Sequence, residues 1–444
     1  MKLKPTLVLL IGIFFFSVSA EAQFLKKLGK RVEQAAERTV LNKSEQKTSK
    51  ETGKVFDKTV EGKGKKKKKK SNSSKNKDNA EPGESTTDDS IENEGPGFGV
   101  NKKFDFVPGE KLIAYEDFSQ DEVGDLPAKW NSSNSAEVVT LNNQEGRWIE
   151  IGQGKGALVP EFINTFPDNF TLEFDVVFDY NVDTYAYVRN FVLGISDLSN
   201  PAYQMDRPDT GKNGFMFAIN GGIGGGGSVK YAKYTTDKNL NLKGEKKIGQ
   251  LNKDNRGRGE KMHISVWRQK QRLRVYVDDQ KVFDVPRAFE KNTDINHLRF
   301  YANISPTDMY YYLGNVRYAV GKPDMRSKLI TEGKLVTYGI TFDSGSAQIK
   351  PASNGTLKEI ASVLNENTSK NVTIIGHTDI DGSDASNLEL SKKRAASVKE
   401  YLVENFGVSQ KQLSTNGKGE TDPLEKGTDP ASKAKNRRVE FIVN

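Results

Sequence analysis

Alternating hydrophobic and polar positions dominate the middle of the chain and predict β-strands there. Residues 171–178 read Thr-Leu-Glu-Phe-Asp-Val-Val-Phe, which places Leu172, Phe174 and Val176 on one face with the period of a half-buried strand. Further short strands, separated by turn residues, are predicted at 191–195, 263–268, 272–277, 281–285, 297–302 and 311–318. A long series of short strands predicts an all-β, two-sheet, jelly-roll-like sandwich over residues 111–325.

The C-terminal part of the chain, residues 326–444, changes to a mixed α and β pattern. Pro351 occupies an early position that favours the start of a helix, and Gly407 follows a long amphipathic stretch in the manner of a helix end. The predicted elements are strands at 334–342, 371–376, 412–415 and 438–443, and helices from 351, over 387–406 and over 430–436. Strands that alternate with helices predict an α/β (βαβαβ) sandwich with helices on one face of the sheet.

The first 22 residues have the features of a secretory signal peptide. Lys2 and Lys4 precede an apolar run from Leu7 to Val18, and Ala20-Glu21-Ala22 fits a small-x-small cleavage site. The apolar run is too short to span a membrane comfortably. The 444-residue chain has no cysteine, which excludes disulfides, thiolate metal sites and the lipidated cysteine of lipoproteins. We therefore expect an exported protein of the periplasm or outer membrane that is not a lipoprotein.

Charge is segregated between that signal and the sandwich. Residues 24–70 hold 17 Lys and Arg against 6 Asp and Glu, and residues 71–98 hold 2 against 7. We expect residues 23–61 to form a basic helical or coiled arm, with a solvated helix favoured over peripheral contact with anionic lipid headgroups. Residues 62–110, which include six consecutive lysines, are predicted to be a disordered charged linker. Export and this segregation argue against nucleic acid as a partner.

The predicted strand series resembles concanavalin-like jelly rolls of the laminin-G and legume-lectin type. Members of that fold bind sugars, act as glycosidases or do neither, so a glycan or an envelope protein is the expected partner of the sandwich. The alternative is a wall-anchored glycoside hydrolase or lyase, which needs two carboxylates across a cleft. Several candidate features of the sandwich have a structural explanation, which we favour. Asp206 and Asp209 are interpreted as part of a polar turn rather than a calcium loop, and residues 221–227 as a flexible loop. The tryptophans are interpreted as core residues and the histidines as structural residues: Trp130, Trp148, Trp267, His263 and His297.

Asp379 and Arg394 are the candidate binding residues of the C-terminal part. Asp379 follows a buried strand at the mouth of a strand-to-helix loop, while Asn387, Arg394 and Tyr401 are seven apart and share one helix face. A carboxylate and a guanidinium in these positions can converge on a ligand that bears both an ammonium and a carboxylate. They can equally form an ion pair that pins the loop to the helix, and the residues alone leave both interpretations open.

Ordered motifs over about 110 residues resemble the signature of OmpA-like (OmpA/MotB/Pal C-terminal) peptidoglycan-binding domains. The motifs are Phe342-Asp343, Ile349-Lys350-Pro351, Gly376-His-Thr-Asp379, Gly382-Ser383, Asn387, Leu390-Ser391, Arg394-Ala395, Ser397-Val398, Gly417-x-Gly419-Glu420, Pro423 and Asn436-Arg-Arg-Val-Glu440. The resemblance implies a domain that binds peptidoglycan without cutting it, with no metal or cofactor.

The resemblance also implies roles for individual residues in binding the diaminopimelate of the peptide stem. Asp379 would hold its amino group and Arg394 its carboxylate. Asp343, Thr378 and Asn387 stand at positions that shape the pocket. Arg437 and Arg438 match the terminal motif, where one of them would form the pocket wall or reach the peptide carboxylate. His377 is expected to be a structural residue.

Overall fold

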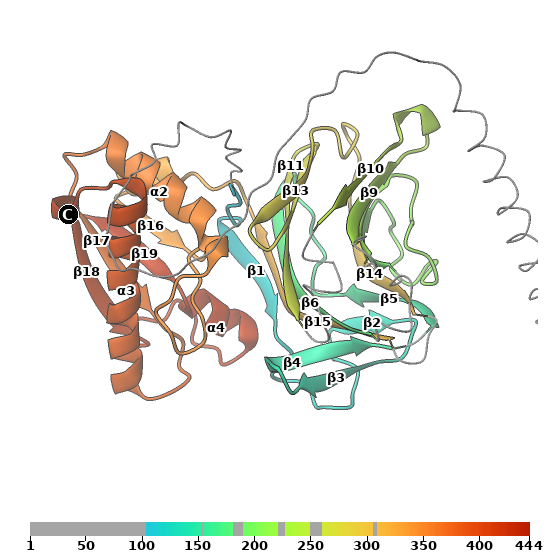
Figure 1. Ribbon diagram of the computed structural model, residues 1–444, viewed down its shortest axis with the longest axis horizontal. Helices are drawn as coiled ribbons and strands as arrows, with labels where there is room; N and C mark the ends of the chain where they lie inside the picture. The colour runs from blue at the N-terminus through green and yellow to red at the C-terminus, as the bar shows by residue number, and fades with distance from the viewer. Residues whose placement is uncertain (1–103, 153, 181–189, 221–226, 249–259, 305–308) are drawn as a thin grey trace, which may run out of the picture. The chain divides into compact units, whose positions relative to one another are not determined.

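Two antiparallel β-sheets are followed along the chain by a mixed α/β domain (Figure 1). The computed structural model describes residues 104–152, 154–180, 190–220, 227–248, 260–304 and 309–444. The predicted signal peptide, the basic arm, most of the predicted linker and most of the glycine-rich loop lie outside the described residues. All of these described residues belong to one compact unit, which contains both the sandwich and the α/β domain.

The first sheet of the sandwich has eight strands, in the order β13-β12-β11-β6-β15-β4-β3, with β1 also paired to β15. Its strands are β1 (Lys111–Glu116), β3 (Ala136–Leu141), β4 (Gln144–Ile151), β6 (Asn169–Tyr180), β11 (Lys261–Gln269), β12 (Arg272–Val277), β13 (Gln280–Val285) and β15 (Met309–Val320).

The second sheet has seven strands, in the order β10-β9-β8-β7-β14-β5-β2. Its strands are β2 (Trp130–Ser132), β5 (Gly154–Pro160), β7 (Phe191–Ser196), β8 (Gly214–Asn220), β9 (Ser228–Tyr234), β10 (Leu242–Lys247) and β14 (His297–Ile304). A short 3₁₀ turn, Lys238–Leu240, lies between β9 and β10.

The core of the sandwich lies between the two sheets, and the alternation in the sequence predicts it correctly. Leu172, Phe174 and Val176 of β6 are fully buried in this core. Each residue on β6 that alternates with them, such as Glu173 and Asp175, lies on the opposite face of the same sheet. The predicted two-sheet sandwich is therefore confirmed. Apolar side chains on alternate residues all lie on one face of a sheet, and the second sheet buries that face.

The packed region begins before β1, within the segment that the sequence analysis assigned to the linker. Phe104, Phe106 and Val107 are buried in one apolar cluster together with Trp267 and Tyr276 of the sandwich and with core residues of the α/β domain. The charged linker composition ends at residue 103, and three apolar side chains within four residues supply enough surface to pack. We call residues 104–110 the connecting segment.

The α/β domain contains a four-stranded sheet in the order β16-β19-β17-β18, in which only β17 and β18 are parallel. Its elements are a π-helical turn (Ser327–Thr331), β16 (Lys334–Thr337), a 3₁₀ turn (Pro351–Ser353), α2 (Asn354–Glu366), β17 (Val372–His377), α3 (Asp384–Phe406), a 3₁₀ turn (Gln410–Gln412), β18 (Leu413–Gly419), α4 (Pro430–Asn436) and β19 (Val439–Val443).

Helices α2 and α3 supply the apolar residues that cover this sheet, as the sequence predicts (Figure 1). Ser383 caps the start of α3 by accepting a hydrogen bond from the backbone of Ser386, and Gly407 ends the helix with a left-handed φ of 67°. The first predicted strand is shorter than expected, because β16 stops at Thr337. Across the residues that the structure describes, no helix is long and apolar enough to cross a membrane.

Candidate functional site

Asp379 lies two residues beyond the end of β17, in the loop that leads into α3. Its side chain is largely buried, and its Oδ2 accepts a hydrogen bond from Nη1 of Arg437 at 2.5 Å. The other carboxylate oxygen accepts a hydrogen bond from the backbone N–H of Asp381 at 3.2 Å. The carboxylate is thus fixed at the mouth of the loop, where the sequence predicts it.

Arg394 lies on α3 and faces the loop that follows β16. Its Nε donates to the carbonyl of Ser346 at 2.9 Å, and its guanidinium lies 4.9 Å from the centre of the Phe342 ring. Burial lowers the pKa of Arg394, an effect that the nearby carboxylate of Asp379 opposes. The two predicted binding residues are therefore electrostatic neighbours, although no hydrogen bond joins them in the described structure.

Six of the seven sequence-predicted site residues line one cavity of about 1000 Å³. These are Asp343, Thr378, Asp379, Asn387, Arg394 and Arg437. The cavity brings together a carboxylate from the β17–α3 loop, a guanidinium from α3 and a second guanidinium from the end of α4. Charges of both signs in one space can recognise a zwitterion.

Asn387 holds the loop that presents Asp379. Its side-chain N–H groups donate to the carbonyls of Asp379 and Asp381, at 3.2 and 3.1 Å, and to a carboxylate oxygen of Glu420 at 2.5 Å. Thr378, next to Asp379, is buried, and its hydroxyl has no hydrogen-bond partner among the described residues. Asn387 therefore affects the cavity indirectly, by fixing the loop between β17 and α3.

Arg438 lies away from this cavity, in a buried ionic cluster. Its Nε donates to Oε1 of Glu440 at 2.8 Å, and both side chains are 1% exposed. Lys334 and His377 also lie near Glu440, with nitrogen-to-oxygen distances of 2.9 and 3.7 Å. Burial raises the pKa of Glu440, but its cationic partners outweigh that effect and the net shift is downward. Of the two adjacent arginines, only Arg437 lines the cavity that holds Asp379 and Arg394.

Tyr115 and Lys350 also line this cavity and were not among the predicted binding residues. Tyr115 of β1 places its ring 5.3 Å from the guanidinium carbon of Arg437. Lys350 lies 3.7 Å from a carboxylate oxygen of Asp343. No local pattern marks Tyr115, because it lies more than 300 residues before Arg437 in an ordinary strand.

The sandwich carries a pair of carboxylates that bears on the enzymatic alternative. Glu173 and Asp175 lie two residues apart on β6, and His263 of β11 lies between them, 2.7 Å from Asp175 Oδ1 and 3.5 Å from Glu173 Oε2. Burial alone would raise the pKa of both carboxylates. His263 and nearby cations, such as Arg317 beside Glu173, lower the pKa by a larger amount, so the net shifts are downward. Glycoside hydrolysis by a carboxylate pair needs one member protonated, and these contacts favour two ionised members.

The turn that contains Asp206 and Asp209 is held by its own side chains. Arg207 forms a two-fold hydrogen bond with Asp209, at 3.2 and 2.7 Å. The described residues contain no group of three or more His, Asp or Glu side chains arranged to hold a metal ion. The sandwich tryptophans are all buried, but only Trp130 lies in the core between the two sheets, whereas Trp148 and Trp267 pack in separate apolar clusters.

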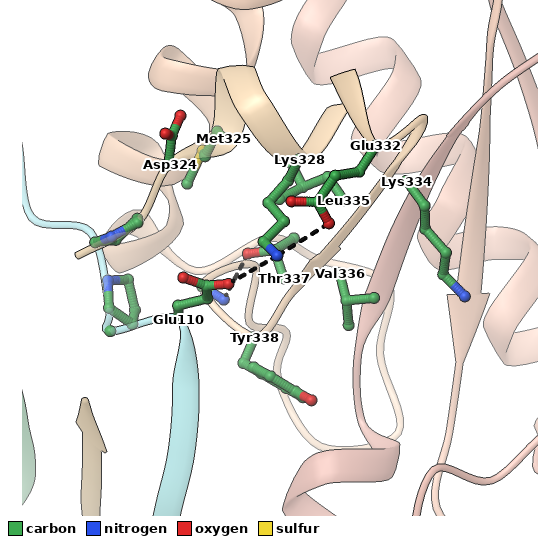
Figure 2. Close-up of a pocket in the computed structure, with 14 residues that line it drawn as sticks. Glu110, Asp324, Met325, Lys328, Glu332, Lys334, Leu335, Val336, Thr337 and Tyr338 are labelled. Carbon is green, nitrogen blue, oxygen red and sulfur yellow. Dashed lines mark hydrogen bonds and ion pairs between the residues drawn. The ribbon is translucent and has the colours of Figure 1, made fainter. Parts of the chain in front are cut away.

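A smaller cavity of about 350 Å³ lies beside β16, and Figure 2 shows its lining. Lys328 sits at its centre, 3.3 Å from Glu110 and 3.0 Å from Glu332. One cation between two carboxylates ties the end of the connecting segment to the turn before β16. This cavity holds none of the sequence-predicted binding residues.

The C-terminal domain belongs to a recognised class of domain. Residues 341–437 match the model of the OmpA family, so the α/β domain is OmpA-like. The match lies entirely within that domain and carries no information about the sandwich.

Individual relatives match about a quarter of this chain. It is similar to the probable lipoprotein YiaD of Escherichia coli K12, with 40% identity over 105 residues, which cover 24% of this chain and 48% of YiaD. It is also similar to the peptidoglycan-binding protein ArfA of Mycobacterium tuberculosis H37Rv, with 39% identity over 24% of this chain and 32% of ArfA. The chain thus spans less than half the length of these curated relatives.

Among solved structures, the peptidoglycan-associated lipoprotein of Burkholderia pseudomallei matches with 26% identity. The match covers 27% of this chain and 98% of that chain, with a TM-score of 0.24.

Proposed function

We propose that this protein is a non-catalytic component of the cell envelope that binds peptidoglycan through its C-terminal domain. The ligand is the diaminopimelate of the stem peptide, whose free end carries an ammonium and a carboxylate on one carbon atom. The sandwich serves a glycan or an envelope protein, and the exported chain resides in the periplasm or at the outer membrane. The OmpA family match over residues 341–437 and the name of the relative ArfA support this proposal.

One observation carries the proposal: Asp379 and Arg394 line the same cavity within the OmpA-like domain. Asp379 accepts hydrogen bonds from the ligand ammonium, and Arg394 donates to the ligand carboxylate with the part of its guanidinium that the carbonyls of Ser346 and Asp343 do not use. Complementary charges hold a zwitterion but supply no nucleophile, so binding without hydrolysis is part of the proposal.

Arg437 would change its hydrogen-bond partner when the ligand binds. In the described structure it forms the ion pair with Asp379 at 2.5 Å, where the ligand ammonium would compete with it. Its guanidinium then becomes available to the carboxylate of the ligand. Asp343, Thr378 and Asn387 shape the cavity around these three charged groups.

The test is co-sedimentation of the full chain with purified sacculi that contain diaminopimelate. Asp379→Ala and Arg394→Ala should each weaken binding by at least about tenfold, because a hydrogen bond to a charged group contributes about 1.5–3 kcal/mol. Glu389→Ala is the matched control, since Glu389 is exposed on α3, forms an ion pair with Lys392 and does not line the cavity.

Unchanged binding of both site variants would show that the residue assignment is wrong. Release of soluble wall fragments by the intact protein would contradict the non-catalytic part of the proposal. Sacculi whose stem peptides carry lysine in place of diaminopimelate should bind more weakly, because the free end of lysine keeps the ammonium but lacks the carboxylate.

A further inference from the structure

The cavity that holds Asp379 and Arg394 has a second wall, which the sandwich supplies. The sandwich contributes residues from four strands and one turn: Tyr115 of β1, the β3–β4 turn and the start of β4 at 143–147, Lys261 of β11 and Asn315 of β15. A volume of about 1000 Å³ is at the upper end of the range for ligand sites. The space is larger than one amino acid needs, so it can hold the residues of the stem peptide next to the diaminopimelate.

Tyr115 connects this second wall to the charged residues of the first. Its ring lies 5.3 Å from the guanidinium carbon of Arg437, and the same guanidinium is paired with Asp379. Burial lowers the pKa of Arg437, but Tyr115 and Asp379 raise it by a larger amount, so the charged form of Arg437 is favoured at this position.

The ring of Tyr115 is itself fixed by the sandwich. Its hydroxyl donates to Oδ1 of Asn315 at 3.1 Å, and the side-chain N–H of Asn315 donates to Asp175 at 2.8 Å. Asp175 in turn is bound to His263 at 2.7 Å. A continuous series of hydrogen bonds therefore runs from the charge cluster on the sandwich sheet to the ring that supports Arg437.

Buried apolar contacts hold the two walls at a fixed spacing. Leu112 of β1, Ala319 of β15 and Ala434 of α4 form one small buried cluster, against which Tyr115 packs. The connecting segment adds a second contact, because a Cβ atom at Gly355 of α2 would lie 2.1 Å from the carbonyl oxygen of Phe106. Close contacts of this kind leave little freedom for the walls to separate.

We infer that the sandwich forms half of the peptidoglycan site, enclosing the stem peptide against the OmpA-like domain, with Tyr115 as the positioning residue for Arg437. This inference rests on the proposed function and deepens it. It assigns part of the sandwich to the same ligand as the C-terminal domain. It also predicts that the full chain recognises the stem peptide beyond its diaminopimelate.

The first experiment measures sacculus binding by full-chain variants of Tyr115. Tyr115→Ala should weaken binding about fivefold, while Tyr115→Phe, which keeps the ring, should stay within about twofold of the wild type. If Tyr115 acts through Arg437, adding Tyr115→Ala to Arg437→Ala should weaken binding no further. Equal binding by Tyr115→Ala and wild type, or a full additional loss in the double variant, would overturn the positioning role.

The second experiment tests the sandwich wall without disturbing any packed residue. The chain has no cysteine, so an exposed Glu145→Cys variant can be labelled uniquely with a bulky maleimide. Glu145 lines the cavity, and the exposed Asn164, which does not, provides the matched Asn164→Cys control. Labelling at position 145 should reduce sacculus binding at least about tenfold, and bound sacculi should slow that labelling; labelling at position 164 should do neither.

The outcomes separate this inference from the proposed function. If Asp379→Ala loses binding while labelled Glu145→Cys binds like wild type, the sandwich wall is not part of the site and the proposed function stands. If Asp379→Ala and Arg394→Ala both bind like wild type, the residue assignment of the proposed function fails, whatever the sandwich variants do.

Discussion

Phe106 is the residue through which we expect the connecting segment to contribute most to stability. Its side chain is 1% exposed. It meets Trp267 edge-on at 6.2 Å and 84°, and Tyr276 at 5.4 Å and 64°, both from the outer face of the first sheet. Its backbone lies against Gly355 of α2, so neighbours on both sides belong to regular elements.

The Phe106→Ala substitution should lower the free energy of unfolding by about 3–4 kcal/mol. Truncation of a buried phenylalanine typically costs about 3–5 kcal/mol, which combines lost burial with the cavity left behind. Two edge-on aromatic contacts are lost as well, each worth about 0.5–1.5 kcal/mol within that total. Strands and a helix around the site limit collapse into the cavity. The connecting segment itself is neither strand nor helix at Phe106 and can relax, which keeps the value below the upper limit.

Urea denaturation followed by tryptophan fluorescence measures this loss, since Trp267 lies beside Phe106 and reports directly on the site. Tyr203→Ala is the control, because Tyr203 is 55% exposed and should change the free energy of unfolding by less than about 0.5 kcal/mol. A loss below about 1 kcal/mol for Phe106→Ala would refute the conclusion that the connecting segment is an integral part of the core. A sandwich transition that shifts alone would show that Phe106 does not couple the two domains.

Two further predictions concern buried charges. Burial lowers the pKa of His263, but Asp175 and Glu173 raise it to about 10, so its protonated form stabilises the fold fully below pH 6.5 and loses that contribution as pH rises through 10. Because His263 is 30% exposed, we expect the free energy of unfolding to fall by only about 2 kcal/mol between pH 7 and 10, less than the full pKa shift would give. Urea titrations should show a flatter dependence of this free energy on pH for His263→Gln than for the wild type. Identical pH profiles for the two proteins would contradict the assignment. Arg438→Ala should cost about 3 kcal/mol by leaving Glu440 with fewer partners. Thermal unfolding measures this loss, and a folded variant with unchanged stability but lost sacculus binding would instead place Arg438 in the ligand site.

Much of the fold follows from local sequence patterns. The period-two alternation of β6 identifies its core face, since apolar side chains on alternate residues can be buried only on one side of a sheet. The limits of α3 are equally local, because Ser383 caps its start and Gly407 adopts the positive φ that ends it. The position of Asp379 beyond a buried strand also follows from the order of the elements.

The tertiary structure decides which of the predicted polar residues share one space. Arg437 and Arg438 are adjacent in one motif, yet one lines the cavity and the other is sealed against Glu440, because the chain turns between α4 and β19. His263 acquires two carboxylate partners only through the register of β11 against β6.

The sequence by itself thus determined the two kinds of domain and the loop and helix that carry Asp379 and Arg394. Only the folded chain brings Tyr115 beneath Arg437 and the connecting segment between Trp267 and α2. The physical reason is sequence separation. Alternation, caps and turns act over a few residues, whereas these contacts join segments more than 150 residues apart and depend on how whole sheets and helices pack.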